Sequence, residues 1–101
     1  MGDFVKTART ADIPAGTGKV FNVGGTPVAV FNAGGKFHAI HNVCVHRGGP
    51  LGEGELDGTA VTCPWHGWVY DVTTGESSTR AGARVACFEV KVEGEEIFVK
   101  T

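Results

Sequence analysis

The sequence predicts an all-β fold, a small antiparallel sandwich or barrel of about eight to ten short strands. Three observations support this prediction. The 16 glycines recur at intervals suited to turns, and the segments between them are rich in β-branched and aromatic residues. No stretch of helical length carries apolar residues at helical spacing without an interrupting glycine or proline. At 101 residues the chain has the size of one domain, which we expect to span residues 1–101.

The strands follow from these patterns in chain order. Glycine pairs at 24–25 and 34–35 separate β-rich segments, and Asp57-Gly58 is the turn of a hairpin over 54–62. Towards the C-terminus, apolar Phe88, Val90 and Val92 alternate with charged residues, which is the period of a half-exposed strand. We therefore expect strands over 19–23, 26–31, 36–40, 59–62, 68–72, 88–92 and 97–100.

Composition excludes several classes of function. Nine basic and eleven acidic side chains give a net charge of -2, and the basic residues are scattered, so no nucleic-acid-binding patch is expected. No apolar run approaches the roughly 20 residues of a membrane span, and the first residues do not open a signal peptide. We expect no membrane association and a cytoplasmic location. Three cysteines, an odd number, indicate reduced thiols or metal ligands rather than a disulfide framework.

Two glycine- and proline-bearing loops, at about 42–52 and 63–68, interrupt the strand pattern. Each carries one cysteine and one histidine, as Cys44-x-His46 and Cys63-x-x-His66. Thiolates with imidazoles suit zinc or an iron–sulfur cluster rather than magnesium or calcium. The order Cys, His, Cys, His argues against an ordinary zinc finger and fits a cluster with two thiolates on one iron and two imidazoles on the other. A structural zinc site is the remaining alternative.

The segments Cys44-Val-His46 and Cys63-Pro-Trp-His-Gly67, followed by Tyr70-Asp71 and Thr74-Gly75, resemble the Rieske family of two-iron, two-sulfur proteins. The resemblance is strong over about 43–75 and weaker over 88–99. It implies one [2Fe-2S] cluster in a two-loop cluster-binding subdomain. It also implies that Cys44 and Cys63 bind the inner iron, and that His46 and His66 bind the outer iron near the surface.

This chain departs from the Rieske subunits of respiratory complexes at three places. Those subunits carry a disulfide between their ligand loops, where Gly49 and Trp65 stand here, and a serine donor where Trp68 stands. Tyr70 matches their tyrosine, whose hydroxyl donates a hydrogen bond to a ligand sulfur. Hydrogen bonds to sulfur raise the reduction potential, so we expect the lower to middle part of the Rieske range, about -150 to +300 mV. Trp65 is expected to shield the cluster, and Gly48 and Gly49 to let backbone N–H groups approach sulfur.

The resemblance implies a soluble one-electron carrier, a Rieske ferredoxin of a ring-hydroxylating dioxygenase system, and not an enzyme. It would pass electrons from a flavin-dependent reductase to a terminal oxygenase, docking near His46 and His66 as a monomer. The alternative is the small subunit of an assimilatory nitrite reductase-like enzyme, which has the same fold. We interpret His38 and His41 as surface residues and Cys87 as a structural or half-exposed thiol without a ligand role.

Overall fold

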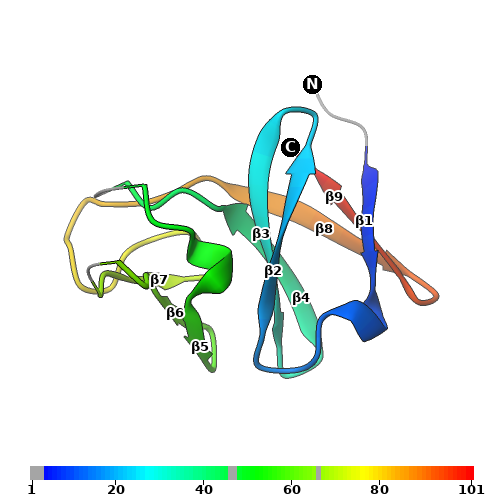
Figure 1. Cartoon of the computed structure of the whole chain (residues 1–101), viewed down its shortest axis with the longest axis horizontal. Coiled ribbons are helices and arrows are strands. Elements are labelled where there is room, and N and C mark those ends of the chain that lie inside the picture. The colour runs from blue at the N-terminus through cyan, green and yellow to red at the C-terminus, as the bar shows by residue number, and fades with distance from the viewer. Residues whose placement is uncertain (1–3, 46–47, 66) are drawn as a thin grey trace.

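The computed structural model describes residues 4–45, 48–65 and 67–101. These residues form nine strands and two 3₁₀ turns, which confirms the all-β prediction. A six-stranded antiparallel sheet has the order β1-β9-β8-β4-β3-β2, and a three-stranded sheet has the order β5-β6-β7 (Figure 1). The strands are β1 Val5–Arg9, β2 Gly18–Val23, β3 Thr26–Ala33, β4 Lys36–His41, β5 Glu55–Asp57, β6 Ala60–Thr62, β7 Val69–Asp71, β8 Cys87–Glu93 and β9 Glu96–Lys100.

Strands β2, β3 and β4 form a meander whose register is fixed by two glycine pairs. Gly24 and Gly25 have φ of 58° and 89°, and the pair between β3 and β4 has equally positive angles. Two consecutive positive φ angles are what a tight hairpin turn needs, and glycine adopts them without steric cost. The turns place Val23 opposite Thr26 and Ala33 opposite Lys36. The predicted segments 19–23, 26–31 and 36–40 are therefore strands.

The first strand, β1, was absent from the sequence prediction. Its residues pair with β9, but the register shifts between Lys6 and Ala8, so the chain loses the simple alternation of apolar and polar side chains. Lys6 pairs with Glu96 of β9, with 2.6 Å between Nζ and Oε2. The strand is thus specified by its partner rather than by its own pattern. In the part of the chain that is described, no helix has the length and apolar character needed to cross a membrane.

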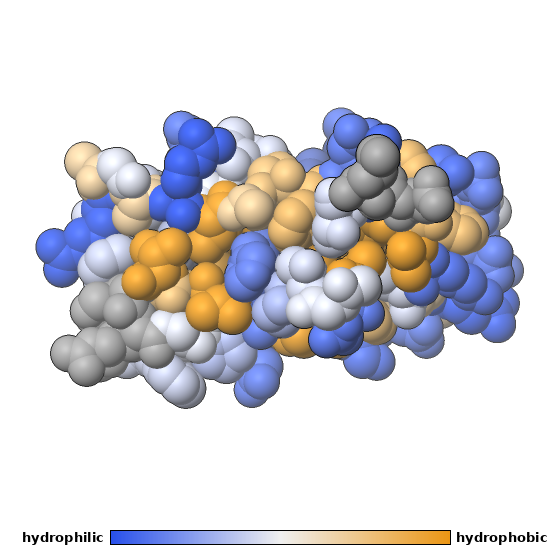
Figure 2. Space-filling model, turned by 90° about the horizontal axis from the view of Figure 1, so that it is seen from above, coloured by the Kyte–Doolittle hydropathy of each residue, from blue (hydrophilic) through white to orange (hydrophobic). Residues whose placement is uncertain are grey.

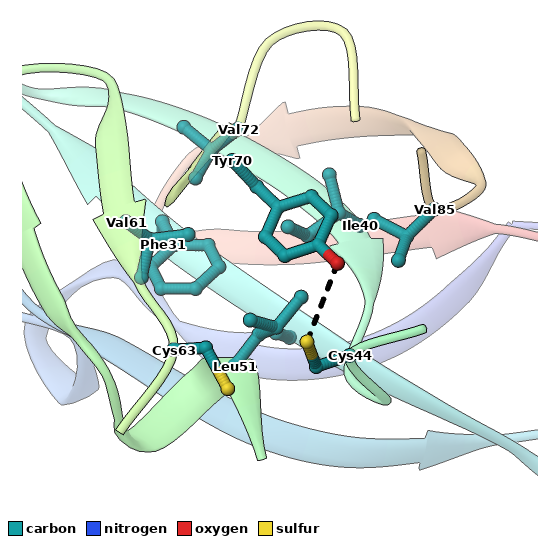
Figure 3. Packing of buried hydrophobic residues seen from close by; sticks show 10 residues of the cluster. Phe31, Ile40, Cys44, Leu51, Val61, Cys63, Tyr70, Val72 and Val85 are labelled. Atoms are coloured by element: carbon teal, nitrogen blue, oxygen red, sulfur yellow. Dashed lines mark hydrogen bonds between the residues drawn. The ribbon is translucent and has the colours of Figure 1, made fainter. Parts of the chain in front are cut away.

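The interior contains two hydrophobic clusters. One lies within the six-stranded sheet and includes Ile13, Val30 and Ile97. The other, which we call the loop-side cluster, lies where the six-stranded sheet meets the three-stranded sheet. It consists of Ala29, Phe31, Ile40, Cys44, Leu51, Val61, Cys63, Tyr70, Val72 and Val85 (Figure 3). The small sheet therefore does not stand alone, because it packs against the larger one through the cluster that contains two cysteines.

Candidate metal centre

Two loops at one end of the molecule present the predicted cysteine ligands. The first connects β4 to β5 and carries Cys44, and the second connects β6 to β7 and carries Cys63. Both side chains are 2% exposed and belong to the loop-side cluster, although they are 19 positions apart in the sequence. Figure 3 shows both sulfur atoms at the same edge of the cluster. The structure therefore brings together the two thiols that the sequence pattern singled out.

The first loop is closed by a pair of backbone hydrogen bonds around its cysteine. The N–H of Gly48 donates to the carbonyl of Cys44 over 2.8 Å, and the N–H of Cys44 donates to the carbonyl of Gly49 over 3.0 Å. Gly48 has a φ of 75°, a conformation that other residues rarely adopt. The cysteine therefore begins a tight turn that glycine completes four residues later.

The second loop repeats the same arrangement. The N–H of Gly67 donates to the carbonyl of Cys63 over 3.1 Å, and the N–H of Cys63 donates to the carbonyl of Trp68 over 2.7 Å. Gly67 has a φ of 76°, within one degree of its counterpart in the first loop. The two loops thus share this pair of hydrogen bonds and a glycine of positive φ. In the sequence, the histidine stands two residues after the cysteine in one loop and three residues after it in the other.

The two loops approach each other closely at Gly49. A Cβ atom at this position would lie 2.6 Å from the Sγ of Cys63 and 3.1 Å from the Cγ of Trp65. The first loop can therefore reach the second cysteine only because residue 49 has no side chain. Gly49 and Trp65 therefore face each other across the two loops. They stand at the two positions where the Rieske subunits of respiratory complexes carry the cysteines of their disulfide. Among the described residues, Cys44, Cys63 and Cys87 form no disulfide.

Tyr70 contacts one of the two thiols. Its hydroxyl oxygen lies 3.3 Å from the Sγ of Cys44, and its ring is fully buried in the loop-side cluster (Figure 3). Burial raises the pKa of the Tyr70 hydroxyl above its ordinary value, and the contact with Cys44 raises it further. The hydroxyl therefore keeps its proton at neutral pH and can donate a hydrogen bond to a thiolate. The predicted contact between Tyr70 and a cysteine sulfur is confirmed.

A buried asparagine holds the base of the first loop, and the sequence analysis missed it. The carbonyl of Asn42 accepts from the N–H of Leu51, and its Oδ1 accepts from the N–H of Gly52, both over 2.7 Å. Asn42 itself donates its N–H to the carbonyl of Pro27. One residue therefore fixes both ends of the loop to β3. Asparagine before a loop is too common a pattern to have revealed this role.

His38, His41 and Cys87, which the sequence analysis interpreted as residues without a ligand role, lie outside the loop-side cluster. His38 and His41 are half-buried on β4, and the Nδ1 of His41 accepts from the N–H of Val43 over 3.1 Å. Cys87 is exposed at the start of β8, and its thiol donates to the carbonyl of Thr73 over 3.4 Å. Burial raises the pKa of the Cys87 thiol, and the carboxylate of Asp71 raises it further, against the opposite effect of Arg84.

The predicted outer ligands, His46 and His66, lie outside the described residues. The described part of the site, around Cys44 and Cys63, fits an iron–sulfur centre. Two buried thiols from matching loops, an apolar lining and a hydroxyl donor at one sulfur are the features by which proteins hold such clusters and tune their potential.

Comparison with known proteins identifies the fold and the family. A Rieske [2Fe-2S] domain model matches residues 3–99. The chain is 36% identical over 98 residues to ferredoxin CarAc of Metapseudomonas resinovorans, covering 95% of this chain and 92% of that one. It therefore belongs to the Rieske [2Fe-2S] domain family, whose centre is one [2Fe-2S] cluster.

Solved structures agree with this assignment. The ferredoxin of carbazole 1,9a-dioxygenase from Nocardioides aromaticivorans IC177 superimposes with a TM-score of 0.90 at 30% identity, covering 95% of each chain. A complex of reduced oxygenase and oxidized ferredoxin in carbazole 1,9a-dioxygenase matches with a TM-score of 0.87 at 34% identity, covering 96% of this chain and 92% of that one. These relatives are electron-transfer components and not catalytic enzymes themselves.

The alternative, a nitrite reductase small subunit, is supported by the fold alone. A putative NADH-dependent nitrite reductase small subunit from Mycobacterium tuberculosis has a TM-score of 0.92 but 19% identity, covering 100% of this chain and 96% of that one. An identity this low shows a common fold and carries no conclusion about function. The greater identity to dioxygenase ferredoxins favours the electron-carrier role over this alternative.

Proposed function

We propose that this protein is the ferredoxin of an oxygenase system, a one-electron carrier between a flavin-dependent reductase and a terminal oxygenase. The observation that carries the proposal is the pair of buried cysteines on two matching loops, in a chain that belongs to the Rieske family over nearly its whole length. When bound, the cluster supplies a reversible one-electron couple. The chain contributes the binding, shielding and tuning of that couple.

The proposed ligands are Cys44 and Cys63 for the inner iron and His46 and His66 for the outer iron. The two described ligands support this set, because each comes from a different loop and both point to one edge of the same cluster (Figure 3). The shared hydrogen-bond pattern around the two cysteines also supports it, and in the sequence each histidine stands one or two residues before the glycine that closes its loop. The cluster-binding loops are then 42–52 and 63–68 of a single domain.

The docking face for redox partners is proposed to surround the two histidines. Three apolar side chains of the ligand loops are exposed there: Val43 at 38%, Val45 at 53% and Trp65 at 57%. Hydrophobic side chains are visible at this end of the molecule in Figure 2. Apolar and aromatic side chains at a loop tip are characteristic of protein interfaces. Trp65 therefore covers Gly49 on its inner side and faces a partner on its outer side.

A reducing compartment is consistent with these features. Three cysteines that form no disulfide among the described residues fit the cytoplasm, where thiols stay reduced.

We also expect the protein to be a monomer, which size-exclusion chromatography of the iron-loaded form will check.

Electron paramagnetic resonance of the anaerobically purified protein tests the proposal directly. The oxidised protein should be silent, and dithionite should produce a signal with an average g value below that of all-cysteine two-iron clusters. His66→Cys should move this signal towards the all-cysteine type and lower the potential, because four thiolates hold a cluster at lower potential. His38→Ala is the matched control and should leave the signal unchanged. Zinc in place of iron in the wild-type protein, with no signal, would contradict the proposal.

A further inference from the structure

In the segment between β7 and β8, residues 77–79 are hydrogen-bonded to β7 at Val69. Ser78 donates its N–H to the carbonyl of Val69 over 3.0 Å, and the Oγ of Ser77 donates to the same carbonyl over 2.9 Å. In return, the N–H of Val69 donates to the Oγ1 of Thr79 over 3.1 Å. Val69 directly follows Trp68, the residue whose carbonyl closes the second ligand loop. This segment is thus attached beside that loop.

Arg80 is held in place by this attachment. Its N–H donates to the Oγ of Ser77 over 3.1 Å, and its carbonyl accepts from the N–H of Ala83 over 3.1 Å. Its guanidinium carbon lies 5.1 Å from the centre of the Trp68 ring, which is a cation–π contact. The backbone on both sides of Arg80 is therefore fixed, and its side chain has a defined position over the indole.

Trp68 links Arg80 to the centre. The indole is half-buried and packs against the loop-side cluster that contains both cysteines. The carbonyl of Trp68 accepts the N–H of Cys63 over 2.7 Å, so the position of the tryptophan backbone determines that of the cysteine. A side chain that packs against the Trp68 ring therefore helps to fix the position of the second ligand loop.

Among the described residues, no carboxylate forms an ion pair with the guanidinium of Arg80. Within the described ranges, the ion pairs join Lys6 to Glu96, Arg9 to Glu95 and Lys91 to Glu93, and Arg80 takes part in none of them. A guanidinium stays charged at every pH of interest. Reduction of an iron–sulfur centre adds one negative charge, and a fixed positive charge nearby stabilises the reduced form.

We propose that Arg80 is a positioning residue that holds the second ligand loop through Trp68 and supplies a fixed positive charge that favours the reduced centre. This inference rests on the proposed assignment of Cys63 and His66 as ligands. It gives the segment between β7 and β8 a role in tuning the centre.

The midpoint potential of three iron-loaded variants tests the charge. Arg80→Gln removes the charge and the stacked cation, and it should lower the equilibrium constant for reduction by about twofold to tenfold, tenfold being 59 mV for one electron. Arg80→Lys keeps the charge and should return the potential most of the way to that of the wild type. Arg84→Gln is the matched control, because it removes the same charge from the same segment without touching Trp68. The shift of Arg80→Gln should shrink as salt is raised.

The rate of iron release to a chelator tests the positioning. Arg80→Gln should release iron faster than the wild type, and Arg80→Lys, whose ammonium still lies over the ring, should release it at an intermediate rate. Equal potentials in Arg80→Gln and Arg84→Gln, with release rates like that of the wild type, would overturn the inference while leaving the electron-carrier role intact. A wild-type protein without a Rieske signal would instead overturn the proposed function and this inference together.

Discussion

At the scale of single residues, the contact between Tyr70 and Cys44 is the most informative feature of the site. A fully buried hydroxyl must find a partner, and here the partner is a sulfur atom 3.3 Å away. Since the pKa of Tyr70 is raised, the hydroxyl remains the donor towards a thiolate ligand. A donated hydrogen bond stabilises negative charge on sulfur, and the reduced centre carries more of it. The contact therefore favours reduction.

Replacing this hydroxyl tests the effect on the potential. Tyr70→Phe keeps the buried ring and removes only the donor, so iron content should stay at the wild-type level. The equilibrium constant for reduction should fall about fivefold, corresponding to roughly 1 kcal/mol for one hydrogen bond. Protein-film voltammetry of both proteins in one buffer measures the difference. If the two potentials coincide, Tyr70 only packs.

Single residues also show where sequence-based prediction stops. Cys44, Cys63 and Tyr70 could be predicted, because their spacing in the sequence carries the resemblance to a family. We expected Gly48 and Gly49 to let backbone N–H groups approach sulfur, and this stays a prediction. The structure adds a separate reason for glycine at residue 49, because a Cβ atom there would lie 2.6 Å from the Sγ of Cys63. That reason depends on a contact with residue 63, which no local pattern contains.

At the scale of the elements, the two ligand loops depend on each other. Each loop is closed by its own hydrogen bonds. The first loop nevertheless passes so close to the second that a Cβ atom at Gly49 would lie 2.6 Å from the Sγ of Cys63. A side chain on one loop therefore displaces a ligand on the other.

Gly49→Ala should expose this dependence. The added methyl group would collide with the Sγ of Cys63, so the variant should bind less iron per chain than the wild type, as measured after reconstitution. Gly25→Ala is the control. It strains a turn of φ 89° with open space around it, and it should cost about 1–2 kcal/mol of stability without lowering iron content. Equal iron content in the two variants would show that the loops have room to separate.

The same scale explains which elements the sequence predicted. Hairpins with glycine pairs, such as the turn at Gly24, were predicted correctly because the signal is local. Strand β1 was missed because its bulge disturbs the alternation, and its pairing with β9 joins opposite ends of the chain. The segment that carries Arg80 was not assigned, since its hydrogen bonds go to Val69 and leave no periodic pattern.

At the scale of the whole molecule, one hydrophobic cluster contains the two candidate ligand cysteines, Cys44 and Cys63, and the other contains neither. The cluster within the six-stranded sheet contains Ile13, Val30 and Ile97 but no cysteine. Its strands are joined by short hairpins and by backbone pairing along β2, β3 and β4. Its stability therefore comes from burial and hydrogen bonding rather than from metal.

Removal of iron tests this division. We expect the metal-free protein to keep the far-ultraviolet circular dichroism of its β-sheet and the slow amide exchange of β3. Amides of 44–49 and 63–68 should exchange faster once the cluster no longer holds the thiols. Hydrogen exchange with mass spectrometry resolves the two regions. Global unfolding on chelation would show instead that the metal is part of the folding free energy of the whole domain.

The placement of both cysteines in the loop-side cluster also bears on how the protein is made. The meander of β2, β3 and β4 joins neighbours in the chain, and it can assemble during synthesis, before residues 63–68 are available. The meander then carries Cys44 just after the end of β4, and the second loop folds against it. The order of synthesis therefore allows the meander to be folded before the second cysteine is available to the cluster.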